Sequence, residues 1–588
     1  MCGIAGIMTA DGGPPDEGRL TTMSAALAHR GPDGRGHYVN GDVGMVQTRL
    51  AIIDLETGDQ PIYEPGGAAL VANAEIYNYL ELREGLADAA FATNSDCEPA
   101  LHLYRRLGIP FAEPLRGMYA IAIHDPDEGR LVLARDRFGI KPLYYVETTA
   151  GFAFASEPQA LIAAGLVAPQ VTEESRAELL QLQFTTGRGT IFERVHRVLP
   201  GETLVVSRGR VVERRHLAAL PAGGPSRWND REALARLDEA LADSVAVHQR
   251  SDVPYGMFLS SGIDSAVILA MMARLNERPV RAFTAGFSGT SAHDERALAR
   301  RMAQRVGAEH VEIEVSEDDF WAMLPAIAAA VDDPAADYAV VPTWKLARTA
   351  GEELKVILCG EGGDELFAGY GRYRSALRPW WQGGRAMRPR GIFDGLGVLR
   401  RHPTGWRDGI VGAESTAAAV AGRSRLQVAQ AVDIADWLPN DLLIKLDRCL
   451  MAHGVEGRTP YLDPEVVEVA FRLGDSLKIR KGLGKYITRR WLADHLPEAE
   501  AFARKRGFTV PVGEWIARRG RDLGTLVARQ PGVREVCAPQ EVRRLFDATG
   551  KRPAAAQWVL LFYALWHRRH VLGATPGDDV FETLAAPA

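Results

Sequence analysis

A segment rich in proline and glycine, residues 218–226, separates two parts of the chain that differ in hydrophobic pattern. Before it, short runs of alternating apolar residues are separated by glycine-containing turns, which predicts β-strands. After it, such runs alternate with longer helical patterns, which is typical of a parallel sheet covered by helices. A chain of 588 residues is also too long for a single core. We therefore expect two domains, residues 1–215 and 230–588.

The first part is predicted to be a layered α+β domain with antiparallel sheets. Its expected strands include residues 43–46, 69–72, 118–123, 131–134 and 152–155. Two helices are expected, near residues 17–29 and 97–107.

The second part is predicted to be an α/β domain built on a parallel sheet. Its expected strands are residues 255–259, 281–287, 310–315 and 356–358. Helices are expected at about residues 231–248, 265–275 and 294–306, followed by one long helix before the last strand. From about residue 375 the chain reads as mostly helical, but residues 380–405, rich in Trp, Arg and Gly, fit no pattern.

Charge and cysteine content exclude several classes of protein. Lys and Arg number 69 and Asp and Glu 75, so the net charge of -6 gives no electrostatic reason to expect nucleic acid or an acidic membrane as a partner. The five cysteines are widely spaced and odd in number, as expected in a reducing compartment. No apolar run reaches ~18 residues and the N-terminus lacks the features of a signal peptide, so a cytoplasmic protein is expected.

Cys2 is the residue of the first part with the clearest chemical meaning. Removal of Met1, which a small second residue permits, would place a thiol and a free α-amino group on one residue. An α-amino group titrates near ~7.7–8.0 and can accept the thiol proton at neutral pH. The thiolate is the nucleophile that acyl transfer requires. A cysteine at position 2 is more often incidental, so its meaning depends on the blocks that follow.

Six further sequence blocks follow Cys2 in order. They are residues 29–34 (HRGPDG), 49–55 (RLAIIDL), 73–78 (NAEIYN), 93–96 (TNSD), 135–145 (RDRFGIKPLYY) and 154–157 (FASE). Together they resemble the class II glutamine amidotransferase domain, which has the N-terminal-nucleophile (Ntn) sandwich fold. The resemblance extends from residue 1 to about 210 and implies that this part hydrolyses glutamine to ammonia at Cys2.

The resemblance also assigns roles to polar residues. Arg49 would bind the α-carboxylate of glutamine, for which a guanidinium fork is suited. Asp96, with Glu75 nearby, would hold the α-ammonium group and also cap the following helix. Asn73 and the backbone N–H of Ala74 would form the oxyanion hole. The family commonly has glycine at position 74, and alanine can supply the same N–H if its φ is negative. In isolation, Arg49 could equally form a surface ion pair.

A strand, a tight loop of small residues and a helix N-terminus follow one another at residues 255–275. The loop, residues 260–265 (SSGIDS), suits phosphate because unpaired N–H groups and the positive end of the helix dipole point at the anion. It is not a Walker A motif. It resembles the pyrophosphate-binding loop of ATP pyrophosphatases, usually SGGxDS, with Ser261 in place of a glycine. Taken alone, the loop could also be an ordinary serine cap.

A second cluster, residues 356–367 (VILCGEGGDELF), ends another expected strand, at the edge where open parallel sheets bind ligands. Asp264 from the first loop and Asp364 from this cluster could share Mg²⁺, which prefers a few carboxylates together with phosphate oxygens. Both clusters resemble those of asparagine synthetases and β-lactam synthetases. Residues 458–463 (RTPYLD) and 482–486 (GLGKY) follow in the order of that family.

The resemblance implies the remaining site residues. Those expected to bind ATP are Leu259, Ser260, Ser261, Gly262, Asp264, Ser265, Ala285, Cys359 and Gly360, with Leu259, Ala285, Cys359 and Gly360 lining the adenosine through their backbones. Glu361 would accept a proton from ammonia near the acyl-adenylate. Lys485 would neutralise charge on the transferred phosphates, although its spacing alone would suggest a surface lysine.

The expected function is that of the glutamine-hydrolysing asparagine synthetase family. Cys2 would release ammonia from glutamine, and ATP would activate aspartate as an acyl-adenylate. Ammonia would convert the adenylate to asparagine, with release of AMP and pyrophosphate. Because residues 375–430 have no assigned role, the same chemistry on a peptide, a sugar acid or a secondary metabolite is left open. A third possibility is a protein that only binds glutamine or a nucleotide. It is disfavoured because such a protein has no need of the Cys2 nucleophile. The expected partners are small molecules, the expected cofactors are ATP and Mg²⁺, and a homodimer is left open.

Overall fold

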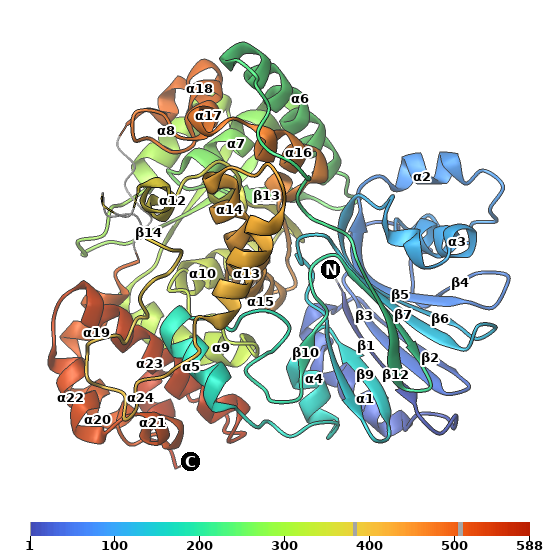
Figure 1. The fold of residues 1–588 in the computed structure, drawn as a ribbon, viewed down its shortest axis with the longest axis horizontal. Coiled ribbons are helices and arrows are strands. Elements are labelled where there is room, and N and C mark those ends of the chain that lie inside the picture. Colours follow the sequence, from blue (N-terminus) through green and yellow to red (C-terminus); the bar gives the residue numbers. More distant parts are fainter. Residues whose placement is uncertain (1, 380, 382–384, 504–509, 588) are drawn as a thin grey trace.

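The computed structural model describes residues 2–379, 381, 385–503 and 510–587 (Figure 1). Most of the N-terminal part, blue to cyan in Figure 1, forms one side of the molecule, and most of the green to red part forms the other. The predicted removal of Met1 concerns a residue outside those described.

The N-terminal part contains two antiparallel sheets of six strands, with the orders β10-β8-β9-β1-β3-β2 and β12-β11-β7-β6-β5-β4. The strands of the first sheet are β1 (Gly3–Thr9), β2 (Gly34–Asn40), β3 (Val43–Arg49), β8 (Tyr144–Thr148), β9 (Gly151–Ala155) and β10 (His196–Arg197). Those of the second are β4 (Ile62–Tyr63), β5 (Ala69–Ile76), β6 (Gly117–Asp125), β7 (Arg130–Arg135), β11 (Glu202–Ser207) and β12 (Arg210–His216).

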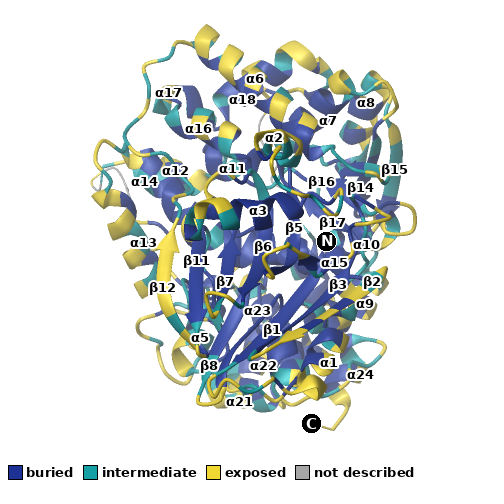
Figure 2. Cartoon of the chain, turned by 90° about the vertical axis from the view of Figure 1, so that its right-hand side faces the viewer, coloured by how far each residue is buried: buried dark blue, intermediate teal, exposed yellow. Residues whose placement is uncertain are grey.

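Apolar side chains fill the space between the two sheets, where Ile4 of the first and Val71 of the second belong to one buried cluster. Because alternate residues of a strand face opposite sides, each sheet also has an apolar outer face. Helix α1 (Glu17–Ala26) packs on the outer face of the first sheet, and α3 (Glu98–Leu107) packs on that of the second. The predicted layered α+β domain is confirmed. Figure 2 shows its strands as mostly buried, with β12 as an exposed edge.

The second part is built on a parallel sheet of five strands, in the order β15-β14-β13-β16-β17. The strands are β13 (Tyr255–Phe258), β14 (Arg281–Gly286), β15 (Glu309–Glu314), β16 (Val356–Leu358) and β17 (Glu456–Arg458). Helices α6 (Asp230–His248), α7 (Ile263–Leu275) and α8 (Arg296–Val306) contribute to one buried cluster against the sheet. The predicted α/β domain is confirmed.

Strand β17 was not predicted, because residues 456–458 (EGR) carry two charged side chains in three positions. Both charges are fully buried and lie in one ion pair, Arg458 with Glu456, at 2.6 Å. Pairing of the charges inside the protein allows a strand that hydrophobicity alone does not indicate.

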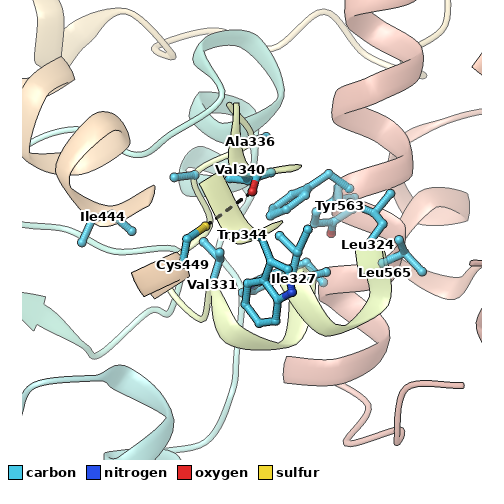
Figure 3. Packing of buried hydrophobic residues seen from close by; sticks show 14 of the residues in the cluster. Leu324, Ile327, Val331, Ala336, Val340, Trp344, Ile444, Cys449, Tyr563 and Leu565 are labelled. Carbon is cyan, nitrogen blue, oxygen red and sulfur yellow. Dashed lines mark hydrogen bonds between the residues drawn. The ribbon is translucent and has the colours of Figure 1, made fainter. Parts of the chain in front are cut away.

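The long helix predicted before β16 is instead two helices, α9 (Glu317–Ala330) and α10 (Val340–Ala350). The chain between them contains Pro334, which cannot donate a helical hydrogen bond, and three aspartates that pair elsewhere. Figure 3 shows how α9 and α10 pack together through Ile327, Val331 and Trp344.

The remaining segments are mostly helical, as expected for the chain after about residue 375, and lie around the three sheets. The helices of the first part are α2 (Tyr79–Gly85), α4 (Pro158–Ala163) and α5 (Glu173–Leu182). Those after β16 are α11 (Gly363–Leu366), α12 (Gly371–Leu377), α13 (Asp408–Ala419), α14 (Arg425–Val432), a π-helix η4 (Asp433–Leu442), α15 (Leu443–Met451), α16 (Pro464–Arg472), α17 (Asp475–Lys478), α18 (Tyr486–His495), α19 (Val512–Arg518), α20 (Gly520–Val527), α21 (Pro531–Val536), α22 (Pro539–Asp547), α23 (Lys551–His570) and α24 (Val580–Ala585). Within the described part of the chain, none of these helices has the length and apolar character needed to cross a membrane.

Candidate active sites

Cys2 lies directly before β1 in a buried position, with 8% of its surface exposed. Its backbone nitrogen donates a hydrogen bond to Oδ1 of Asn73 over 3.0 Å. Burial raises the pKa of the Cys2 thiol, while the adjacent Leu50 backbone and Gln47 side chain act in the opposite direction. Because the raised pKa favours the neutral thiol, a base must remove its proton before Cys2 can attack a substrate.

In the side-chain amide of Asn73, the oxygen and the nitrogen differ in hydrogen bonding. Oδ1 accepts from Cys2, whereas Nδ2 is buried and has no hydrogen-bond partner among the described residues. A buried donor without an acceptor is rare and calls for an explanation. A negative oxygen formed on a substrate beside Cys2 would supply the missing acceptor.

The backbone N–H of Ala74 points to the same edge of β5 as those of Ala72 and Ile76, because alternate N–H groups of a strand share one side. Ala72 donates to Oε1 of Gln60 over 2.6 Å, and Ile76 donates to Oδ2 of Asp96 over 2.7 Å. On this edge β4 pairs only with the first two residues of β5. Ala74 is not among the described residues with positive φ, so alanine fits here without strain.

Arg49 ends β3, and its side chain is 9% exposed. Nη1 lies 2.8 Å from Oδ1 of Asp59, and Nη2 donates to the carbonyl oxygen of Asp54. The Asp59 side chain is 82% exposed, so the guanidinium faces a carboxylate that water can also solvate. A substrate carboxylate can replace a partner of this kind at little cost. Binding of glutamine by Arg49 stays a prediction.

The expectation that Asp96 caps the following helix is wrong. Helix α3 begins at Glu98, and its N-cap residue is Cys97, which forms no side-chain cap hydrogen bond. Asp96 instead accepts from the N–H of Ile76 in β5. Burial raises the pKa of Asp96 to about 6. The carboxyl group is therefore held against the same edge of β5 that presents the Ala74 N–H.

Glu75 is paired with a residue of the second part of the chain. Nη2 of Arg458, at the end of β17, lies 2.8 Å from Oε2 of Glu75. The Nη1 atom of Arg458 also donates to the carbonyl oxygens of His248 and Arg250. The resemblance implied that Glu75 lies near Asp96, but it did not indicate the contribution of Arg458. Its only sequence signal was its place at the start of the 458–463 block.

In the second part, Lys485 joins the two predicted phosphate clusters. Its Nζ pairs with Oδ2 of Asp264 and lies 2.6 Å from Oδ1 of Asp364. Burial would lower the pKa of Lys485, but the two carboxylates outweigh burial and raise it. The lysine is 3% exposed, so it is not the surface residue that its spacing alone would suggest.

Glycine residues allow these clusters to approach each other. A Cβ on Gly369 would lie 1.7 Å from Oδ1 of Asp364, and one on Gly363 would lie 2.5 Å from Cγ of Asp264. Any larger residue at either position would push the carboxylates apart. Gly363 and Gly369 are therefore required by the geometry of the site.

The N–H groups of the 260–265 loop are bonded within the protein, so the expectation that they are unpaired is wrong for three of them. Ser260 donates to Oγ of Ser265 over 3.0 Å, and Gly262 donates to Oγ of Ser260 over 3.0 Å. The N–H of Ser261 lies 3.4 Å from Oε2 of Glu295, whose Oε1 accepts from Oγ of Ser261 over 2.8 Å. Hydroxyl groups can rotate to other partners, so phosphate binding by the loop stays a prediction.

A cavity of about 880 Å³ lies over this loop. Its wall includes the predicted residues Ser260, Ser261, Gly262, Asp264, Asp364 and Lys485. The other predicted residues are not part of that wall: Leu259, Ser265, Ala285, Cys359, Gly360 and Glu361. The backbone N–H of Leu259 bonds to Phe283, and that of Cys359 bonds to Arg458, each over 2.8 Å. Contact of these residues with adenosine stays a prediction.

Five further residues line the same cavity: Asp337, Tyr370, Arg372, Trp437 and Lys445. Nζ of Lys445 lies 3.2 Å from Oδ2 of Asp337, and the Arg372 guanidinium lies 3.9 Å from the Tyr370 ring centre. Sequence reasoning missed all five residues. They come from the break between α9 and α10, from α12 and its edge, from η4 and from α15, and no local pattern connects these segments.

Comparison with known proteins matches each part of the chain to a family. Residues 1–217 match the family described as glutamine amidotransferase domain, and residues 236–568 match the family described as asparagine synthase. The chain is 31% identical to the glutamine-hydrolyzing asparagine synthetase 1 of Bacillus subtilis (strain 168), over 96% of both proteins. It is 31% identical to amidase chry2 of Gibberella zeae, over 64% of this chain and 60% of that protein. A solved structure of the allosteric regulatory enzyme of purine biosynthesis covers 53% of this chain and 80% of its own, with 17% identity and a TM-score of 0.30.

Proposed function

The chain belongs to the asparagine synthase family, and from that membership we propose that it makes asparagine, with Cys2 freeing ammonia from glutamine and the second site activating aspartate with ATP. It is an ATP-dependent ligase that uses glutamine as amido donor. The observation that carries the proposal is the environment of Asn73, whose Oδ1 holds the Cys2 nitrogen while Nδ2 is buried without a partner among the described residues.

At the first site, glutamine would bind with its α-carboxylate at Arg49 and its α-ammonium at Asp96. The Cys2 nitrogen, free once Met1 is removed, takes the thiol proton, and Sγ attacks the amide carbon. The resulting oxyanion accepts from Nδ2 of Asn73 and from the N–H of Ala74, and each such donor contributes roughly 3–4 kcal/mol in related acyl transfer. The Cys2 ammonium group gives this proton to the amide nitrogen, the C–N bond breaks to release ammonia, and water hydrolyses the γ-glutamyl thioester to glutamate and the free thiol.

At the second site, a carboxylate oxygen of the acceptor would attack the α-phosphorus of ATP and displace pyrophosphate. Lys485 neutralises the charge that develops on the phosphates. Ammonia then attacks the acyl carbon, AMP leaves, and Glu361 takes the proton released from nitrogen. Burial raises the pKa of Glu361, which makes its carboxylate a stronger base than an exposed one.

Mg²⁺ fits the pair Asp264 and Asp364, because both carboxylates meet at Nζ of Lys485 and so face one point. Mg²⁺ is usually held by one or two carboxylates, with phosphate oxygens and water as its other ligands. Such a site needs only one or two protein ligands. The described residues contain no cluster of three or more Asp, Glu, His or Cys side chains suited to a metal. When bound, the ion would neutralise phosphate charge.

Arg458 of β17 contacts a predicted residue of each site, which supports direct transfer of ammonia. The side chain of Arg458 pairs with Glu75 of the first site. The carbonyl oxygen of Arg458 accepts from the N–H of Cys359, two residues before Glu361. Ammonia is mostly protonated in neutral water and then has no lone pair for attack, so a short internal route would preserve the nucleophile.

Aspartate suits the five further lining residues of the cavity by charge. Asp337 can face its ammonium group, and Arg372 and Lys445 can face its carboxylates. The alternative acceptor is a larger acid, because the rings of Tyr370 and Trp437 also line the cavity and aspartate does not need them. A cavity of about 880 Å³ is near the upper end of the range of roughly 300–1,000 Å³ for ligand sites.

The test is to supply the purified protein with glutamine, ATP, Mg²⁺ and aspartate and to measure asparagine, AMP and pyrophosphate. Asparagine, AMP and pyrophosphate are expected in equal amounts. Pyrophosphate release with another acid, and none with aspartate, would select the alternative acceptor. No release of pyrophosphate with any acid in a panel of amino acids, peptides and sugar acids would contradict both.

Glutamine binding is expected to weaken in mildly acidic solution because of Asp96. The carboxylate form attracts the α-ammonium group, and the pKa of Asp96 is raised to about 6, so the charge is lost as pH falls through that value. The KM for glutamine should rise about tenfold for each pH unit below the pKa. Initial rates between about pH 5 and 8 measure this, and Asp96→Asn should give a high KM with little pH dependence. A wild-type KM that is constant over this range would rule out Asp96 as the ammonium site.

A further inference from the structure

Arg30 is a fully buried arginine that contacts the backbone of the nucleophile residue. Its Nε donates to the carbonyl oxygen of Cys2 over 3.2 Å, and 0% of its surface is exposed. Gly31, the next residue, packs directly on β3, where a Cβ would lie 2.3 Å from the carbonyl carbon of Thr48. The chain at Arg30 is thereby pressed against the sheet, and its guanidinium lies next to Cys2.

Asp447, from the second domain, holds this guanidinium at two points. Its Oδ2 accepts from Nη1 of Arg30 over 2.7 Å, and its Oδ1 accepts from Nη2 over 2.9 Å. Glu157 of the first domain also accepts from Nη1 over 2.7 Å, but the same oxygen contacts Nε2 of His29 at 3.1 Å. Among the described residues, Asp447 alone makes a two-point contact with Arg30. Such a contact fixes the plane of a guanidinium group as well as its position.

Helix α15 keeps Asp447 in place. Oδ2 of Asp447 also accepts from Nη1 of Arg448 over 2.7 Å, and Nε of Arg448 donates to Oδ1 of Asp332 over 2.9 Å. On the same helix, Sγ of Cys449 lies 3.7 Å from the carbonyl oxygen of Val340 in α10 (Figure 3). The Asp447 carboxylate is therefore anchored from its own domain and is not free to follow a movement of Arg30.

We propose that Asp447 is a positioning residue for the nucleophile: it holds Arg30, and Arg30 holds the carbonyl group of Cys2. The second domain thus sets the orientation of the thiol and the amino group in the first. This inference rests on the proposed function of Cys2. Removal of Met1 makes Cys2 the first residue, and a chain end is poorly ordered unless it is tied down. The Asn73 contact restrains its nitrogen, and the Arg30 contact restrains its carbonyl.

Asp447→Asn would disturb this arrangement, although the asparagine side chain has nearly the same shape as that of aspartate. One oxygen of the carboxylate would become an NH₂ group, which cannot accept from a guanidinium N–H. Arg30 would then turn toward Glu157 and leave the Cys2 carbonyl. A displacement of about 1 Å at a reacting group can lower a rate by roughly a hundredfold.

The test compares Asp447→Asn with Asp333→Asn. Both variants remove one buried carboxylate charge that contacts a buried arginine of the first part at two points, but Asp333 bonds to Arg197 and Tyr144 and, within the described part of the chain, forms no hydrogen bond or ion pair with Arg30, Arg448 or Cys2. For Asp447→Asn, kcat of glutamine hydrolysis should fall by roughly tenfold to a hundredfold, with the KM for glutamine and the rate of synthesis from ammonium chloride within about twofold. For Asp333→Asn, kcat should change less than about threefold.

Equal losses of kcat in the two variants, or a parallel loss of ammonia-dependent synthesis, would overturn the proposal, because both indicate general loosening of the domain interface. If Asp447→Asn does not fold, Arg30→Lys decides. Lysine keeps the positive charge, but its single ammonium group cannot contact the Asp447 carboxylate at two points and also reach the Cys2 carbonyl. The same selective loss of kcat is therefore expected. An unchanged kcat would overturn the proposal. A wild-type protein that hydrolyses no glutamine would instead contradict the proposed function, and this is measured first.

Discussion

Replacement of Cys2 by alanine is expected to lower glutamine-dependent synthesis by a factor on the order of 10³ or more, while synthesis from ammonium chloride stays within about twofold. The first effect follows because the proposed nucleophile is the Cys2 thiol, beside the Asn73 amide, and alanine has no nucleophilic atom in its place. The second follows because the cavity over the 260–265 loop contains no part of the first site. The measurement is asparagine formed per enzyme from each nitrogen source at saturating ATP and aspartate.

Cys537→Ala is the matched control, since Cys537 is also buried and lies among the C-terminal helices, away from both sites. It should retain both activities within about twofold. Loss of both activities in Cys2→Ala would contradict two separable sites. Retention of glutamine-dependent synthesis in Cys2→Ala would remove Cys2 from the mechanism.

The sequence predicts the parts of each site that lie within one short segment. Asn73 and Ala74 are adjacent in one block, and Asp364 lies among the glycines of residues 360–369 in another, so the resemblance to the family implies their roles. The same holds for the strand, loop and helix that carry Asp264. These features depend on backbone geometry over a few residues, which local residue types determine.

Contacts between distant segments could not be predicted in this way. Arg30 and Asp447 are 417 residues apart, and neither is unusual in its own segment. Arg458 reaches Glu75 only because residues 456–458 form the edge strand of the parallel sheet. Charged residues normally indicate exposed surface, so a pattern of hydrophobicity assigns such segments to the outside. Their burial becomes visible only when the opposite charge is placed beside them.

The two wrong predictions of local structure, the Asp96 helix cap and the single long helix, have the same cause. Asp96 had the composition of a helix cap, but the N–H of Ile76 in a neighbouring strand offered it a partner. The long helix predicted before β16 is interrupted because Asp332 and Asp333 pair with Arg448 and Arg197. In each case a tertiary contact outweighs a local preference of about 1 kcal/mol or less.

Replacement of Lys485 by alanine is expected to produce the opposite separation of activities from Cys2→Ala. Lys485 is the cation shared by Asp264 and Asp364. In the variant the two carboxylates would lie near each other without this shared positive charge. One of them would then take up a proton more readily, and the charge on the transferred phosphates would lack its neutralising group. Pyrophosphate release should fall by roughly 10² to 10³-fold with either nitrogen source. Glutamine hydrolysis should remain within about threefold of wild type, because Cys2 and Asn73 are untouched.

Lys481→Ala is the control that separates charge from backbone strain in this prediction. Lys481 also has a positive φ, of 52°, against 59° at Lys485, but it is exposed. Both substitutions therefore carry a similar backbone cost, and only Lys485 removes a buried cation. Pyrophosphate release in Lys481→Ala should stay within about twofold of wild type. Equal losses in the two variants would attribute the effect to the turn at residues 481–485 and not to charge at the phosphates. Loss of glutamine hydrolysis in Lys485→Ala would show that the lysine also supports the first site, against two chemically independent centres.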